Sequence, residues 1–126
     1  MNSLRIRISA LVAVGCALFA AGCQRSSAPP PPMAIEELPG AFQMAFSKAK
    51  ADARESANEV VVAVQAKDYA KAYAVLQNLL GQSSLTPEQR SATARGLLAV
   101  NGALQSAQAQ GDAAAAETLK QIRRNR

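Results

Sequence analysis

Residues 86–110, TPEQRSATARGLLAVNGALQSAQAQ, carry the clearest local signal for secondary structure in the chain. Thr86 is suited to cap a helix, Pro87 to occupy its first position, and Gln89 to complete a capping box three residues after the cap. The stretch therefore predicts a helix from Thr86 to about Gln110. Its apolar stripe comprises Thr93, Leu97, Val100, Leu104 and Ala107.

A second stripe on the same helix contains only small residues: Ala92, Gly96, Ala99 and Ala103. Glycine inside a helix costs up to about 1 kcal/mol relative to alanine, so its presence calls for compensation. Small side chains allow a neighbouring helix to approach closely. Gly96 and Gly102 both carry this cost. We expect tight helix packing to compensate for it at Gly96 at least.

The preceding residues also follow a helical period, and no segment shows the alternation of a half-buried strand. One stripe predicts a helix from about Pro39 to Ala66. Asp68 is placed to cap a second helix, and Gly81 is expected to end it in the left-handed conformation. The first stripe contains Ile35, Leu38, Phe42, Phe46, Ala49, Ala53, Ala57, Val60 and Val64, and the second contains Tyr69, Ala72, Tyr73, Leu76, Leu79 and Leu80.

A short fourth helix is expected after the turn Gly111-Asp112. Its inward residues are Ala115, Leu119 and Ile122, and the arginines of residues 123–126 lie at its negative dipole end. The fold class is therefore all-α, with about four helices in two successive helical hairpins over residues 34–126.

Residues 65–76 and 108–119 are similar at an offset of 43, which suggests that the hairpin is an internal repeat. Both turns resemble the turn between the paired helices of tetratricopeptide repeats, in which glycine, a polar residue and an aromatic precede an alanine. Tyr69, Ala72 and Leu76 fall on matching positions in the first copy, and Ala115 and Leu119 in the second. The resemblance implies a protein-binding scaffold whose groove is lined by the first helix of each pair.

The amino-terminal residues have the layout of a secretory signal. A short stretch over residues 1–7, with the basic residues Arg5 and Arg7, is followed by an uncharged apolar run over 8–21. This run is shorter than the roughly 20 residues that a membrane-spanning helix needs. It ends in Phe19-Ala20-Ala21-Gly22-Cys23, which resembles a bacterial lipobox, although Ala20 stands where the family most often has leucine. Cys16 is a rival that would leave only a short apolar run.

The resemblance implies cleavage between Gly22 and Cys23 and lipid attachment to Cys23, so that residues 1–22 are a signal peptide. Three acyl chains would anchor the protein to a lipid bilayer almost permanently. Residues 23–33 then form a tether, in which four prolines favour an extended conformation. Gln24, by analogy with enterobacterial lipoproteins, indicates the outer membrane, with the body facing the periplasm.

Composition limits the chemistry. The 126 residues include no histidine and only two cysteines, too few ligands for a zinc or iron–sulfur site, and we expect no metal, no cofactor and no catalytic residues. The net charge is +5, or +3 from Cys23 onward, and an exported protein rarely meets nucleic acid, so nucleic acid is not an expected partner.

Two functions fit these observations. The first is a non-enzymatic envelope scaffold or accessory subunit that binds another envelope protein or itself, with Phe42, Phe46, Tyr69 and Tyr73 as candidate contact residues. The second is a structural spacer that holds the cell wall or another anionic envelope polymer. Proteins that resemble the enterobacterial murein lipoprotein link covalently through a terminal lysine, whereas this chain ends in arginine and offers only charge attraction.

Overall fold

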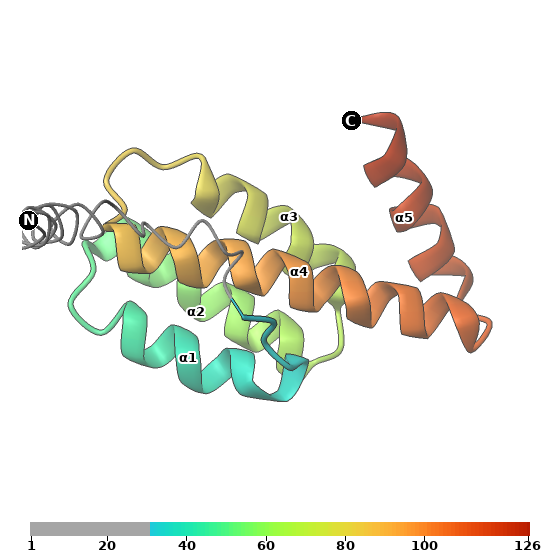
Figure 1. Ribbon diagram of the computed structural model, residues 1–126, viewed down its shortest axis with the longest axis horizontal. Coiled ribbons are helices and arrows are strands. Elements are labelled where there is room, and N and C mark those ends of the chain that lie inside the picture. Colours follow the sequence, from blue (N-terminus) through green and yellow to red (C-terminus); the bar gives the residue numbers. More distant parts are fainter. Residues whose placement is uncertain (1–30) are drawn as a thin grey trace, which may run out of the picture.

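The computed structural model describes residues 31–126, and this part of the chain is all-α, without a strand. It confirms the expected fold class, with five α-helices in place of about four (Figure 1). The elements are a 3-10 turn η1 (Ile35–Glu37), α1 (Leu38–Ala45), α2 (Ala51–Gln65), α3 (Tyr69–Leu80), α4 (Pro87–Ala109) and α5 (Ala113–Arg124).

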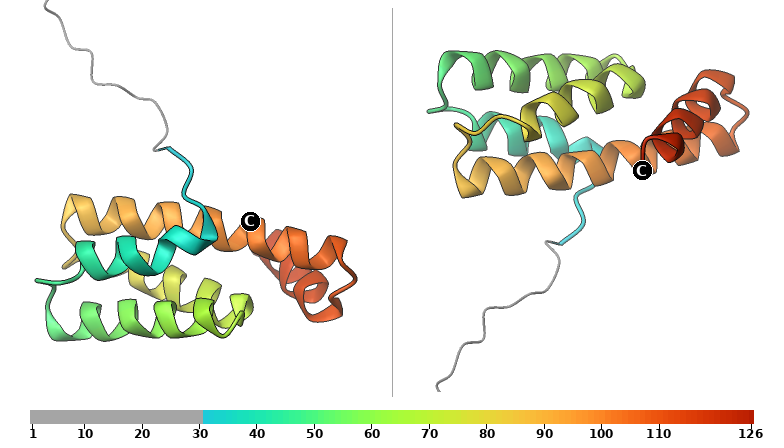
Figure 2. Two further views of the ribbon diagram at one scale, coloured as in Figure 1. Left: turned by 90° about the horizontal axis from the view of Figure 1, so that it is seen from below. Right: turned by 90° about the horizontal axis from the view of Figure 1, so that it is seen from above.

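Helices α1 to α4 form a closed bundle in which consecutive helices run in opposite directions (Figures 1 and 2). Helix α1 packs against α2 and α4, and α3 packs against the same two helices from the other side. With 23 residues, α4 is about 34 Å long and extends beyond its neighbours. Helix α5 folds back onto that extension, so the hairpins α2–α3 and α4–α5 are both present and α1 closes the bundle.

The single helix expected over residues 39–66 is wrong, because the chain turns at residues 46–50 and divides into α1 and α2. Every member of its apolar stripe is nevertheless buried or half-buried. A continuous helix of that length would reach about 42 Å and carry half its stripe past the 12-residue α3, whereas folding back buries both halves in one core. No capping signal marks the break, since Lys50 at the start of α2 makes no side-chain cap.

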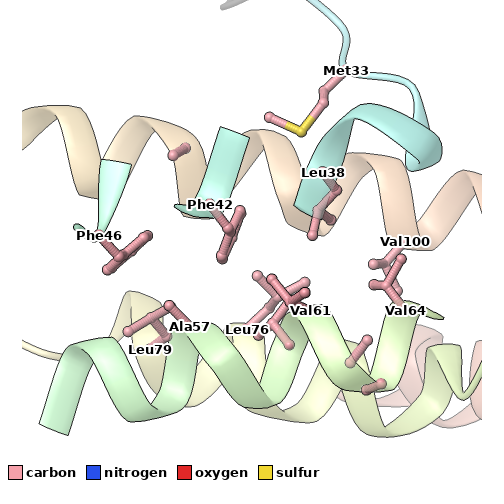
Figure 3. Close-up of a cluster of buried hydrophobic side chains, with 14 of the residues drawn as sticks. Met33, Leu38, Phe42, Phe46, Ala57, Val61, Val64, Leu76, Leu79 and Val100 are labelled. Atoms are coloured by element: carbon pink, nitrogen blue, oxygen red, sulfur yellow. The ribbon is translucent and has the colours of Figure 1, made fainter. Parts of the chain in front are cut away.

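The tight packing expected at Gly96 is confirmed where α1, α3 and α4 meet. A Cβ atom added at Gly96 would lie 3.0 Å from Cε2 of Phe42 and 3.2 Å from Cδ2 of Leu76. Both side chains are fully enclosed in the core, part of which is drawn in Figure 3. Gly102 lies on the outer side of α4 with no atom within 4 Å of such a Cβ, so close packing does not account for it.

The capping box at the start of α4 is also confirmed. Thr86 Oγ1 accepts a hydrogen bond from the Gln89 backbone N–H at 3.2 Å, and Gln89 Oε1 accepts one from the Thr86 N–H at 3.0 Å. The buried Gln89 amide also donates through Nε2 to the carbonyl oxygen of Ala45, at the end of α1. One side chain thus caps α4 and satisfies a free carbonyl of its neighbour.

The turns before α3 and α5 share one geometry. Lys67 (φ 57°) and Gly111 (φ 91°) adopt the left-handed conformation, and an aspartate follows each as the helix cap. The N–H of Asp68 donates to Ala63 and that of Asp112 to Ala107, which aligns the turns at an offset of 44. Gly81, by contrast, is right-handed (φ −72°), so the left-handed stop expected there is wrong.

The buried stripes of the two short helices align at the offset of 43 seen in the sequence. Ala72 and Leu76 of α3 are buried, as are Ala115 and Leu119 of α5. Since the turns align at 44, the buried face of α5 is rotated by one residue, about 100°, relative to its cap. The offset of 43 expected from the sequence therefore holds for the buried positions of the short helices, whereas the two turns share their geometry at an offset of 44.

The chain enters the bundle through a strap over residues 31–34, which runs beside the middle of α4 (Figure 2). Arg95 of α4 donates from Nε to the carbonyl oxygen of Pro31 at 2.9 Å. Met33, which we assigned to the tether, is a core residue with 6% of its surface exposed. The core therefore includes the end of the predicted tether.

The two glycines of α4 give a matched test of this packing. Gly102→Ala should stabilise the fold by up to about 1 kcal/mol, because it gains helix propensity and meets no neighbour. Gly96→Ala should instead lower the free energy of unfolding, because neither enclosed neighbour can move aside. Urea denaturation followed by circular dichroism measures both, and equal gains from the two variants would contradict the close contact.

Lys67 is a non-glycine residue in a conformation that costs about 1–2 kcal/mol for most side chains. Lys67→Gly should therefore raise the free energy of unfolding by about 1 kcal/mol, less the entropy that glycine adds to the unfolded chain. Lys71→Gly, in the first turn of α3, is the control and should lower it, because it loses helix propensity and the ion pair with Glu59. A loss of stability on Lys67→Gly would show that the left-handed turn is not formed in solution.

Candidate functional site

The described part of the chain contains a groove of about 470 Å³ between the carboxyl-terminal half of α4 and α5. Three amide side chains of α4 form one wall, at spacings of four and three residues that place them on one helix face. Two aliphatic side chains of α5 form the floor, and the opposite wall consists of one arginine of α5 and one just beyond its end. The lining residues are Asn101, Gln105, Gln108, Leu119, Ile122, Arg123 and Arg126.

The charges at this α4–α5 groove are all positive, because Arg123 and Arg126 line it together with no acidic residue. Neither arginine forms an ion pair in residues 31–126. Arg124, between them in sequence, instead pairs with Glu117 of the same helix at 3.5 Å. Arg123 in the last turn of α5 and Arg126 just beyond that helix line the same groove, where their guanidinium groups can bind an anion.

The floor of the groove is apolar and partly covered. Leu119 is 5% exposed and belongs to the core, while Ile122 is half-buried and packs against the core from its edge. The amide walls both donate and accept hydrogen bonds. A ligand that matches this lining has an anionic group, a polar body with donors and acceptors, and a small apolar portion.

Two candidate contact residues from the sequence lie in the core instead of on the surface. Phe42 is 1% exposed and Phe46 2%, and their rings stack with centroids 5.3 Å apart (Figure 3). In this fold they have almost no area to offer a partner. Their role is to pack α1 against the bundle, and the same apolar stripe that suggested contact residues explains that burial.

The other two candidates, Tyr69 and Tyr73, are half-buried on α3 and pack against the edge of the core. The Tyr73 hydroxyl accepts a hydrogen bond from Nε2 of Gln77 at 3.3 Å, so its polar end reaches the rim as expected. The structure does not place either tyrosine in the α4–α5 groove.

The proposed cleavage and lipidation residues, Gly22 and Cys23, lie outside the described residues. Among residues 31–126, no helix has the length and apolar character needed to cross a membrane. The same residues contain no cluster of three or more side chains suited to hold a metal ion.

Sequence reasoning missed the amide wall of the groove. Asn101, Gln105 and Gln108 were assigned no role, although their spacing of four and three already placed them together on α4. The spacing alone could not show that α5 folds back beside them. The arginines of residues 123–126 were interpreted as residues that complement a helix end or attract an anionic polymer, and not as part of a groove.

The chain matches no protein-family model, and neither a curated protein nor a solved structure matches it.

Proposed function

We propose that this protein is a lipid-anchored component of the bacterial envelope, with a helical body that binds another envelope protein as a scaffold or accessory subunit. The ordered pattern at the amino terminus carries the proposal: basic residues, an uncharged apolar run, small residues, and Cys23 after Gly22. The location follows as a membrane surface, with the outer membrane facing the periplasm favoured by Gln24.

The attachment between tether and body supports this arrangement. Arg95 holds the Pro31 carbonyl, and Met33 is sealed into the core only ten residues after the proposed lipid site. A force applied to the tether would therefore act on the middle of α4 and on the core, and not on one end of the bundle. The buried Met33 would remain within about 30 Å of the lipid surface, given roughly 3 Å for each of the ten residues after Cys23 if they are extended.

A non-enzymatic role is part of the proposal. With no histidine in the chain, proton transfer near neutral pH would depend on carboxylates or lysines. The carboxylates of α2 lie on its exposed face, and Glu59 there pairs with Lys71 of α3 at 3.2 Å across the surface. This distribution is typical of a solvated helix face.

A structural spacer is the second candidate. One observation favours it: Arg123 and Arg126 line a groove without acidic neighbours, where an anionic cell-wall polymer could be held by charge. The two candidates differ in what is recovered with the protein from cells.

Crosslinking in cells, followed by purification and mass spectrometry, tests the proposal. Wild type should copurify with a discrete envelope protein from the membrane fraction. Cys23→Ser should lose acylation, membrane retention and that partner, because a single cysteine carries the anchor. Cys16→Ser is the matched control and should behave as wild type.

Recovery of only cell-wall fragments or lipid would favour the spacer. Membrane retention of Cys23→Ser equal to that of wild type would contradict the lipid anchor.

A further inference from the structure

We propose that the α4–α5 groove binds a short peptide segment of the partner through a carboxylate of that segment. The inference rests on the proposed protein-binding role and assigns it to one surface. The groove is the place in residues 31–126 where unpaired arginines, amide side chains and an apolar floor meet.

The positive charge of the two arginines at the groove favours a ligand with an anionic group. Arg123 and Arg126 are exposed and lie three residues apart, Arg123 in the last turn of α5 and Arg126 two residues beyond its end, and the lining residues include no Asp or Glu side chain. A guanidinium is planar and presents two parallel N–H groups, which match the two oxygens of a carboxylate. The guanidinium groups of Arg123 and Arg126 can bind one carboxylate together, or one of them can bind the carboxylate and the other a nearby carbonyl oxygen of the ligand.

The amide side chains of the opposite wall favour a peptide as the rest of the ligand. The primary amides of Asn101, Gln105 and Gln108 each donate and accept, as a peptide backbone does. A carbohydrate would be expected to stack on an aromatic ring, yet the lining holds none and the whole chain has no tryptophan. Ile122, half-buried at the floor, offers an apolar contact to an aliphatic side chain.

The position of the groove is compatible with a partner at the membrane. Helix α5 packs chiefly on the extension of α4, beyond the ends of α1 and α2, so the groove is built from the end of the body that the bundle leaves uncovered (Figures 1 and 2). The strap over residues 31–34 reaches α4 earlier, at Arg95. A segment bound in the groove therefore does not compete with the strap.

Peptide titration tests the proposal with the full-length protein in non-ionic detergent. The probes are fluorescent pentapeptides of Ala and Leu with a free terminal carboxylate, the same sequence amidated, and an amidated version with one internal Asp. Fluorescence anisotropy gives the affinities, and backbone NMR shifts locate the site. At least one carboxylate peptide should bind, the amidated neutral peptide should not, and the shifts should centre on residues 101–108 and 119–126.

The three arginines of residues 123–126 allow matched variants to be compared. Arg123→Gln and Arg126→Gln should each weaken binding about tenfold, because each removes a charge-assisted hydrogen bond. Arg124→Gln removes the same charge from the same turn of helix, but its guanidinium pairs with Glu117, so affinity should stay within about twofold. Binding of the free terminus alone identifies a chain end as the source, and binding of the Asp peptide identifies an acidic side chain.

Three results would overturn the assignment: no carboxylate peptide binds, Arg124→Gln weakens binding as much as the other two, or the shifts lie elsewhere. A preference for an anionic polysaccharide over every peptide would also overturn it. If a partner is crosslinked in cells but its capture is unchanged in an Arg123→Gln, Arg126→Gln double variant, the groove assignment fails while the scaffold proposal stands.

Discussion

The bundle depends on the approach of α1 and α3 to α4 at Gly96. The absence of a side chain there lets the Phe42 ring and Leu76 come within about 3 Å of the position that a Cβ would occupy. These two residues belong to different helices, so the same vacant position sets the distance of both from α4. The loss of helix propensity at Gly96, about 1 kcal/mol, is offset by the enclosure of two large apolar side chains.

Polar contacts at the start of α4 also join this helix to its neighbours. Gln89 caps its own helix and binds the last carbonyl of α1, and Arg90 donates to the carbonyl of Leu80, at the end of α3, and to that of Gln82 in the following loop. The bonds to Ala45 and Leu80 satisfy carbonyl groups that the ends of α1 and α3 leave free. They join the helices that meet at Gly96, so α4 organises the bundle through its small face and its first turn. Its second half, which the bundle leaves uncovered, is where α5 packs and the groove forms.

Much of this architecture could be predicted from the sequence because the relevant signals are local. The capping box at Thr86, the aspartate caps of α3 and α5, and the small stripe around Gly96 are each defined by a few neighbouring residues. The break at residues 46–50 could not be predicted, since the apolar period continues through it without a shift and Lys50 supplies no cap. What decides the break is the length of the neighbouring helices, a tertiary property.

The candidate site, too, could be predicted from the sequence only in part. The arginines of residues 123–126 and the aromatic stripe were visible in the sequence, but periodicity cannot distinguish a buried aromatic from an exposed contact residue. Burial removed Phe42 and Phe46 from the surface and left the tyrosines at its edge. The groove required the fold, because its two walls are separated by a turn whose left-handed Gly111 redirects the chain. The proposed lipid site depends on residues 1–23, and its support remains in their order along the chain.

The most direct test of the central contact is a double-mutant cycle between Phe42 and Gly96, measured as the free energy of unfolding in urea. Phe42→Leu removes the two ring atoms that would lie 3.0 and 3.1 Å from an added Cβ. We expect Gly96→Ala to destabilise the wild-type protein but to be more favourable by at least about 1 kcal/mol in the Phe42→Leu background. The same change in both backgrounds would contradict the claim that the approach of Phe42 to Gly96 sets the spacing of the bundle.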